Sequence, residues 1–361
     1  GIGFIMYCFS DIRGFSKTYD GKVIALSRYN GLFISKGKDF IPLFNPRKDI
    51  ASIYSADGKI FYCGLWNGQV LVYDYARNSS KILNVGLTNS IISFVKAVNN
   101  SLVIGSFGEG AVILDTETLK IKVPKGILLP DYQIDKIIVD KANNLWFATE
   151  TGIVKYNLIS KKQQLYSKGK NSEIGLPENN VSDILMDSDG IIWAATVKGL
   201  AMYVAAKDNF IAVLGQKDLE DKWITDLAED SKGYLWLNIN NNSVAKYKKG
   251  QKTVNIYHVN TGNRLDIFSS KGFFNFNDTA IYLAGKNGII YFSPNSIKEN
   301  KWAPSPVITE FKVHNEEIFP GVVIEGQVPL KKSINYLKEV QLNYSNRNFS
   351  VQFSAPSYTN E

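Results

Sequence analysis

The strongest constraint on this 361-residue sequence is a pair of turn signals that recurs seven times. Each copy has a first turn rich in Asp, Asn and Gly, a short apolar run, and a second turn with Gly or Asn eight to ten residues later. The first turns follow one another at spacings of 37 to 46 residues, and they are Asp20-Gly21, Asp57-Gly58, Asn99-Asn100, Asn143-Asn144, Asp189-Gly190, Lys232-Gly233 and Asn277-Asp278. Asp, Asn and Gly tolerate the backbone angles that reverse a chain, so both signals predict tight turns between strands.

The copy at residues 180–203 shows what one unit contains. Residues 181–186 and 191–196 are strand-like apolar runs, a third run follows Lys198-Gly199, and a fourth spans residues 210–214. Four antiparallel strands repeated at this period are typical of the blades of a β-propeller. Helical repeats of similar length need a period of 3.6 residues, which the sequence lacks.

The repeats predict an all-β chain with two parts. Residues 1–303 are expected to form a seven-bladed β-propeller, and residues 304–361 the first part of a truncated β-sandwich with strands at 307–313, 340–344 and 349–353. The last repeat lacks a fourth strand. We therefore expect residues 4–8 to pair with residues 289–292 and close the ring, because sharing one blade between two ends of the chain removes unpaired strand edges.

Composition excludes several classes of function. Hydrophobic residues make up 45% and aromatic residues 12% of the sequence, as in a globular protein, and no apolar run is long enough for a membrane-spanning helix. The net charge is +7, but Lys and Arg are scattered among Asp, Glu and Asn. A direct nucleic-acid partner is therefore not expected, although a cationic surface would help to attract anionic ligands.

Residues suited to catalysis or metal binding are few. His258 and His314 are the only histidines, and the sequence has no paired metal-ligand motif and no phosphate-binding loop. Cys8 and Cys63 are too few for a disulfide framework, and their apolar neighbours favour buried free thiols, with the redox state left open. We expect no catalytic residue, no metal site and no cofactor.

The best-preserved repeats resemble the two-component regulator propeller repeat. The shared pattern is an apolar strand, Asp-x-x-Gly-x-Ile/Leu-Trp, then Thr-x-x-Gly-Leu/Ile and an aromatic residue; it is clearest at residues 181–203 and 134–156, and residues 224–247 keep it with Asn242 in place of Gly. In the first three repeats the Trp is replaced by Ala25, Tyr62, and Val103 or Ile104. Residues 288–313 and 342–361 resemble the family's junction with its three-tyrosine, Ig-like β-sandwich and the opening of that domain.

This resemblance implies a role in signalling. It points to the periplasmic sensor region of a Bacteroides-type hybrid two-component system, part of an inner-membrane protein whose histidine kinase and response regulator lie elsewhere in the chain. Such regions contain two propellers, dimerise through the sandwich and commonly recognise oligosaccharides to control genes for polysaccharide use. On this basis the fragment itself is not an enzyme, a propeller precedes it, and the ligand lies on this propeller or between the two.

The residues that recur in every well-kept repeat have a structural interpretation. Trp146, Trp193 and Trp236 hold one position in successive blades, which predicts packing between blades. Asp140, Asp187 and Asp230 end the innermost strands, where we expect them to accept hydrogen bonds from turn amides. We therefore expect the residues that determine ligand specificity at positions where the seven repeats differ.

The candidate ligand residues lie in turns of the divergent blades and in one connection. Loops on a rigid scaffold are where recognition concentrates, and aromatic rings beside polar groups suit sugars. The candidates are Arg28, Tyr29, Trp66, Asn67, Phe107, Glu109 and Trp223.

Two other classes of function stay open. A propeller glycoside hydrolase would need two carboxylates at a defined separation, which the sequence neither supports nor excludes. A propeller lyase would need a channel histidine, and the shortage of histidines weighs against it. A non-catalytic scaffold that binds only protein is the remaining alternative.

Overall fold

A computed structural model describes residues 11–37, 39–43, 49–97, 99–127, 133–169, 174–213, 219–251, 254–258, 268–276, 280–286, 288–295, 297 and 306–354. The chain divides into two compact units, one of Ile2–Ser296 and another that contains Ile297–Glu361. Within the described ranges no helix is long and apolar enough to cross a membrane.

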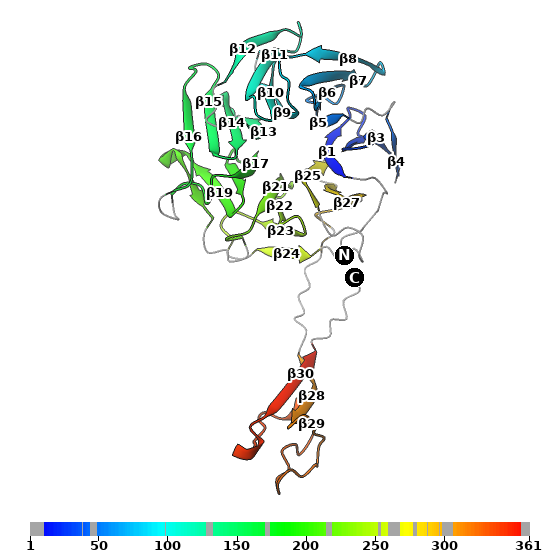
Figure 1. Ribbon diagram of the computed structural model, residues 1–361, viewed down its shortest axis with the longest axis vertical. Helices are drawn as coiled ribbons and strands as arrows, with labels where there is room; N and C mark the ends of the chain where they lie inside the picture. The colour runs from blue at the N-terminus through cyan, green and yellow to red at the C-terminus, as the bar shows by residue number, and fades with distance from the viewer. Residues whose placement is uncertain are drawn as a thin grey trace. The chain divides into compact units, whose positions relative to one another are not determined.

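The first unit is a ring of seven antiparallel sheets around a central axis (Figure 1). Six sheets have four strands each, and the seventh has three strands among the residues that the structure describes. This is the seven-bladed β-propeller that the repeats predict. The expected closing strand at residues 4–8 lies outside the described residues. The backbone N–H of Asp11 donates to the carbonyl of Lys286 (2.6 Å), so the start of blade 1 contacts the turn between the second and third strands of blade 7.

The strands of each blade run outward from the axis in chain order (Figure 1). Blades 1 to 3 contain β1 (Ile12–Lys17), β2 (Val23–Ser27), β3 (Gly31–Lys36), β4 (Asp39–Pro42), β5 (Ile50–Tyr54), β6 (Ile60–Leu65), β7 (Gln69–Asp74), β8 (Ser79–Asn84), β9 (Ile91–Ala97), β10 (Ser101–Ser106), β11 (Ala111–Asp115) and β12 (Ile121–Ile127). Blades 4 to 7 contain β13 (Ile134–Val139), β14 (Asn144–Thr149), β15 (Gly152–Asn157), β16 (Gln163–Tyr166), β17 (Val181–Met186), β18 (Ile192–Thr196), β19 (Gly199–Val204), β20 (Asn209–Ala212), β21 (Ile224–Glu229), β22 (Leu235–Ile239), β23 (Ser243–Tyr247), β24 (Asn255–His258), β25 (Phe268–Phe276), β26 (Ala280–Gly285) and β27 (Gly288–Phe292). A short 3-10 turn, η1 (Ala205–Lys207), precedes β20.

The hydrophobic core lies in layers between successive blades. Trp146 of blade 4 packs with Val181 and Ile184 of blade 5, and Trp193 of blade 5 packs with Ile224 and Leu227 of blade 6. Alternate residues of one strand face opposite neighbours because side chains in a strand alternate sides. The predicted packing role of the repeated tryptophans is confirmed.

Each repeated tryptophan also donates a hydrogen bond to the repeated aspartate. The indole Nε1 to Oδ2 distances are 2.9 Å for Trp146–Asp140, 2.7 Å for Trp193–Asp187 and 2.9 Å for Trp236–Asp230. The other carboxylate oxygen accepts turn amides, as predicted, from Asn144, Ile191 and Tyr234. One carboxylate therefore fixes both the turn and the indole.

The first three blades fill the tryptophan position with other residues. Tyr62 packs toward blade 3 and Val103 packs toward blade 4, as the repeated tryptophans pack toward the following blade. The prediction that Tyr62 takes the tryptophan position is therefore confirmed, and of the two residues predicted for blade 3 it is Val103, not Ile104, that takes it. The prediction that Ala25 takes the tryptophan position in blade 1 is wrong. Ala25 packs toward blade 7, and Ile24 is the residue that packs toward blade 2. A shift of one residue along a strand reverses the face, and turn spacing alone did not resolve that shift.

The innermost strands of blades 1 to 6 share a β-bulge that positions the candidate site. In each strand one residue is skipped in the pairing with the second strand. A bulge re-aims the side chain of its extra residue. The skipped residues are Arg13, Ala51, Ile92, Asp135, Ser182 and Thr225.

The residue after the bulge joins blades 2 to 6 each to the following blade. The contacts, in blade order, are Ser52 Oγ to the Ile91 carbonyl (2.6 Å), Ile137 N to Ser93 Oγ (3.1 Å), Lys136 Nζ to Asp183 Oδ1 (2.9 Å), Leu227 N to Asp183 Oδ2 (2.9 Å) and Gly272 N to Asp226 Oδ1 (2.9 Å). Adjacent positions of one strand thus have different roles: in blades 1 to 4 the bulged residue lines one cavity, and in blades 2 to 6 the next residue joins the blades.

The second unit contains a three-stranded sheet in the order β29 (Glu316–Glu317), β28 (Val307–Val313), β30 (Phe349–Ser354), with 3-10 turns η2 (Ile334–Tyr336) and η3 (Tyr344–Asn346). Two of the three predicted strands are present. The strand predicted at residues 340–344 is wrong: Val340 and Leu342 pack against the cluster around Phe311 without joining the sheet. Alternating apolar residues can pack on a core without backbone pairing, and here they do.

Candidate ligand-binding site

The turn between the second and third strands is tied to the start of an innermost strand by a recurring backbone hydrogen bond. The N–H of Arg28 donates to the Asp11 carbonyl (2.9 Å), that of Trp66 to Asp49 (3.0 Å) and that of Phe107 to Ser90 (2.8 Å). Blades 5 and 6 repeat the bond from Val197 to Asn180 (3.2 Å) and from Asn240 to Trp223 (2.8 Å). The turn residues therefore lie beside the bulged residues of the innermost strands.

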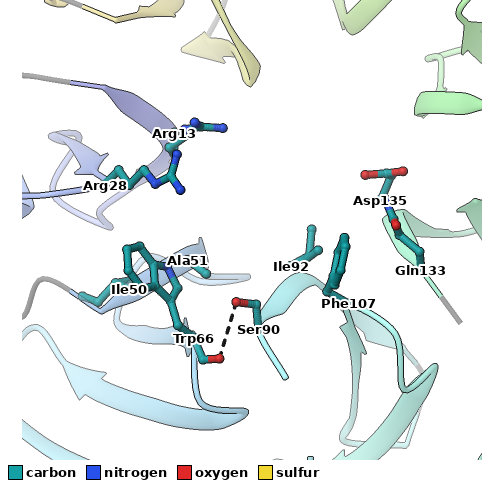
Figure 2. A pocket seen from close by; sticks show the side chains of 10 residues that line it. All are labelled: Arg13, Arg28, Ile50, Ala51, Trp66, Ser90, Ile92, Phe107, Gln133 and Asp135. Atoms are coloured by element: carbon teal, nitrogen blue, oxygen red, sulfur yellow. Dashed lines mark hydrogen bonds between the residues drawn. The ribbon is translucent and has the colours of Figure 1, made fainter. Parts of the chain in front are cut away.

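A cavity of about 600 Å³ lies where these turns meet the innermost strands of blades 1 to 4 (Figure 2). This volume is typical of a site for a small molecule. Its lining comes from the three turns and from the bulges and strand starts, and consists of Arg13, Arg28, Ile50, Ala51, Trp66, Ser90, Ile92, Phe107, Gln133 and Asp135.

Two arginines occupy one side of the cavity. Arg13 donates from Nε and from an Nη atom to the two carboxylate oxygens of Asp11, each at 3.0 Å. Arg28 Nη1 lies 3.6 Å from Asp11 Oδ2, and its guanidinium carbon lies 5.4 Å from the Tyr29 ring and 5.7 Å from the Trp66 ring. One carboxylate and two aromatic faces thus hold both guanidinium groups in place.

Two half-exposed aromatic rings line the cavity between its two sides. Trp66 is 41% and Phe107 is 48% exposed. The turn that carries Trp66 is closely packed, because a Cβ on Gly68 (φ +79°) would lie 2.3 Å from the Leu87 carbonyl oxygen. Ser90 Oγ donates to the Trp66 carbonyl at 3.5 Å (Figure 2). These rings are therefore apolar surfaces on a fixed backbone.

The side opposite the arginines carries polar groups from blade 4. Figure 2 shows Asp135 and Gln133 across the cavity from Arg13 and Arg28. The next residue, Lys136, pairs with Asp183 of blade 5. The cavity thus has cations at one end and a carboxylate at the other.

The predicted ligand residues divide into two groups. Arg28, Trp66 and Phe107 line one cavity, and Tyr29 flanks it through its contact with Arg28. Asn67 instead bonds within its own turn, to Gln69. Trp223 lies at the start of β21, and its indole donates to Ser182 Oγ (3.0 Å). Asn67, Glu109 and Trp223 are not among the lining residues.

Glu109 stabilises a neighbouring loop. Its carboxylate accepts hydrogen bonds from Thr88 N (2.8 Å), Thr88 Oγ1 (2.6 Å) and Asn89 N (2.9 Å). Burial raises the pKa of Glu109, but the hydrogen bonds from Thr88 and Asn89 outweigh it and hold the pKa below its usual value. The geometry assigns this carboxylate to the connection between blades 2 and 3.

Sequence reasoning missed the contribution of the innermost strands. Arg13, Ile92 and Asp135 line the cavity from bulges, which leave no insertion or turn residue in the sequence. The available signal was variation: the second residue of the innermost strand differs in each of the first six blades, whereas the first residue is always Ile or Val.

A buried ionic group lies on the innermost strands of blades 4 to 6. Asp226 accepts hydrogen bonds from Thr225 Oγ1 (2.9 Å) and Asn238 Nδ2 (3.0 Å) as well as from Gly272. Burial, together with the charge of Asp183, raises the pKa of Asp226 to about 6. In the described part of the chain no three His, Cys, Asp or Glu side chains come together as a metal site.

The remaining candidates for reactive groups are not among the described residues that line the cavity. Cys63 is a buried free thiol, as predicted, and burial raises its pKa to about 12; Cys8 lies outside the described residues. His258 ends the outermost strand of blade 6, and His314 lies in the second unit at the turn after β28.

A family model described as a two component regulator propeller matches residues 175–198, which contain β17 and β18 of blade 5. These residues are a two-component regulator propeller repeat. The repeat includes Asp187 and Trp193, whose hydrogen bond recurs in blades 4 and 6. The predicted resemblance is confirmed.

The proteins that this chain matches are longer than the chain. Over 314 residues the chain is 27% identical to histidine kinase P4 of Formosa agariphila, covering 83% of this chain and 23% of that protein. The extracellular domain of the hybrid two-component system BT3049 of B. thetaiotaomicron has a TM-score of 0.73 at 17% identity, covering 97% of this chain and 47% of that one. The corresponding domain of BT4673 from the same organism has a TM-score of 0.66 at 19% identity, covering 86% and 41%. These structures share the fold, and this chain spans less than half of each.

Proposed function

We propose that this chain is part of the ligand-sensing region of a hybrid two-component histidine kinase and response regulator of the Bacteroides type. The region lies in the periplasm as part of an inner-membrane protein. Its ligand is an oligosaccharide derived from a glycan, and binding changes the transcription of genes for polysaccharide use.

One observation carries this proposal. Turn residues of three successive blades and bulged residues of four innermost strands line a single cavity of about 600 Å³. Trp66 and Phe107 offer flat apolar surfaces to the C–H faces of a sugar ring, and Arg28, Gln133 and Asp135 offer polar groups to its hydroxyls. Because the scaffold is rigid, the site needs little ordering when a ligand binds.

The comparisons support the signalling part of the proposal. One relative is named a histidine kinase, and two solved structures of the same fold are extracellular domains of hybrid two-component systems. We propose that this chain is part of a longer protein that also contains the kinase and a preceding propeller, and that forms a homodimer through its β-sandwich.

The lining of the cavity favours binding over catalysis. A retaining or inverting glycosidase uses two carboxyl groups on either side of the scissile bond, about 5 to 9.5 Å apart. Asp135 is the one carboxylate among the described residues that line this cavity. We therefore propose a non-catalytic role for this chain.

Calorimetry with the purified chain and a panel of short oligosaccharides tests the proposal. Trp66→Ala should abolish the binding of every oligosaccharide that binds to the wild-type chain, because it removes an aromatic ring that lines the cavity. Trp223→Ala is the matched control, since both tryptophans are 41% exposed and only Trp66 lines the cavity. Binding should survive in that variant.

Three results would overturn the proposal. Cleavage of an oligosaccharide by the purified chain would make it an enzyme. Binding that is lost in Trp223→Ala and kept in Trp66→Ala would place the ligand elsewhere, and a chain that binds a protein partner but no oligosaccharide would be an interaction scaffold.

A further inference from the structure

We infer that the cavity selects a ligand with one anionic group, a carboxylate or a sulfate ester, at the end formed by Arg13 and Arg28. This inference rests on the proposed function and specifies the class of oligosaccharide that the site recognises. It comes from the balance of fixed charges around the cavity.

Among the residues that the structure describes, the arginine end has an excess of positive charge. Two guanidinium groups face the cavity there, and one carboxylate, that of Asp11, pairs with them. Asp11 is paired bidentately with Arg13, while Arg28 Nη1 is 3.6 Å away, beyond hydrogen-bond distance. An anionic ligand group placed between the guanidinium groups would balance the second charge and receive charge-assisted hydrogen bonds.

The guanidinium groups are held in position before any ligand arrives. The backbone carbonyl of Asp11 accepts the backbone N–H of Arg28 (2.9 Å), and the N–H of Asp11 donates to the Lys286 carbonyl (2.6 Å), so contacts within blade 1 and with blade 7 hold the backbone of Asp11 in place. The rings of Tyr29 and Trp66 flank the Arg28 guanidinium. Fixed donors bind an anion without the loss of side-chain entropy that a flexible lysine would incur.

The opposite end disfavours a second anionic group. Asp135 lies there, across the cavity from Arg13 and Arg28 (Figure 2). A carboxylate accepts hydrogen bonds from sugar hydroxyls and repels another carboxylate or sulfate. The charge pattern thus fixes the direction of the ligand, with its acidic residue toward blade 1 and a neutral, hydroxyl-bearing residue toward blade 4.

Three related probes test this inference by calorimetry on the purified 361-residue chain. They are a disaccharide of glucuronic acid linked to a neutral hexose, the methyl ester of that disaccharide, and a neutral disaccharide that carries a single sulfate ester. The acid or the sulfate is expected to bind at least about tenfold more tightly than the uncharged ester, because a hydrogen bond to a charged group is stronger than a neutral one. Whichever of the two charged probes binds more tightly shows whether the site prefers a carboxylate or a sulfate ester.

Variants assign the preference to the two arginines. Arg13→Gln and Arg28→Gln should each weaken binding of the anionic probe about tenfold to hundredfold, and should weaken binding of the methyl ester by a clearly smaller factor, because the ester loses only neutral hydrogen bonds. Arg77→Gln is the control, since Arg77 pairs with Asp74 on the outer β7–β8 turn and is exposed. Asp135→Asn should improve binding of a disaccharide with an acid on both residues. Unchanged thermal unfolding would show that each variant is folded.

The outcomes separate this inference from the proposed function. If the methyl ester binds as tightly as the acid, and Trp66→Ala abolishes both, the site binds oligosaccharides but the charge selection is wrong. If the anionic preference persists in both arginine variants, the inference is wrong as well. If neither charged nor neutral probes bind to the folded chain, both the inference and the proposed function fail.

Discussion

Lys136 Nζ lies 2.9 Å from Asp183 Oδ1, and this ion pair joins the innermost strands of two neighbouring blades. The Asp183 side chain is 7% exposed, whereas that of Lys136 is 44% exposed. Asp183 also accepts the backbone N–H of Leu227 (2.9 Å) in the following blade. A single carboxylate therefore connects three blades.

Lys136→Met is expected to lower the free energy of unfolding by about 1–3 kcal/mol, because it leaves the Asp183 carboxylate buried without its cation. The loss is smaller than for a fully buried pair, since Lys136 is partly solvated. Denaturant unfolding measures it, with Lys141→Met in the β13–β14 turn as control. The double variant with Asp183→Asn should recover part of the loss, and no recovery would argue against the pairing.

Asp187→Ala removes the acceptor of both the Trp193 indole and the Ile191 amide. We expect a loss of about 2–4 kcal/mol, the sum of two hydrogen bonds to a charged group discounted for partial exposure. Asp189→Ala, an exposed neighbour in the same turn, should change stability by less than about 0.5 kcal/mol. Equal effects of the two substitutions in thermal unfolding would contradict the structural role of Asp187.

Asp226 gives stability a dependence on pH that is opposite to that of most carboxylates. Its pKa is raised from 3.8 to about 6, so the folded protein holds a proton that the unfolded chain releases. Its contribution is therefore largest at low pH and is lost as pH rises through about 6. Measured against Asp226→Asn, which stays neutral, the wild-type unfolding temperature should fall between about pH 4 and pH 7. A constant difference would contradict the shift.

Glu109→Ala should affect stability more than ligand binding. It removes the acceptor of three hydrogen bonds from Thr88 and Asn89, and the expected cost is about 1–3 kcal/mol. Because Glu109 does not line the cavity, any oligosaccharide that needs Trp66 should bind this variant within about threefold of wild type at a temperature where it is folded. A complete loss of binding in the folded variant would assign Glu109 to the site after all.

Cys63 should resist alkylation in the native protein. Burial raises the pKa of its thiol to about 12, and the reactive species is the thiolate. At about pH 8, iodoacetamide is expected to label Cys63 at least about 100-fold faster in denaturant than in buffer. Mass spectrometry of the peptide that contains Cys63 distinguishes it from Cys8. Rapid native labelling would indicate that the interface between blades 1 and 2 opens.

The sequence predicted the parts of the fold that repeat, because every blade needs the same turns and the same Asp–Trp pair. Asp187 and Trp193 were identifiable from spacing alone. Trp66 and Phe107 were found because bulky aromatic residues at turns stand out. Arg13 and Asp135 were missed, since a bulge is a change in pairing that requires no special residue. The segment around Val340 was assigned wrongly because packing and pairing leave the same alternation of apolar residues.

The bulge and the residue after it have a consequence for how the lining of the cavity can diversify. In blades 2 to 4 the bulged residue lines the cavity and the next residue joins two blades, so the first can change while the second is kept. Few substitutions would then suffice to change the surface that the cavity offers, and an engineer could exchange Ala51 or Ile92 without redesigning a blade.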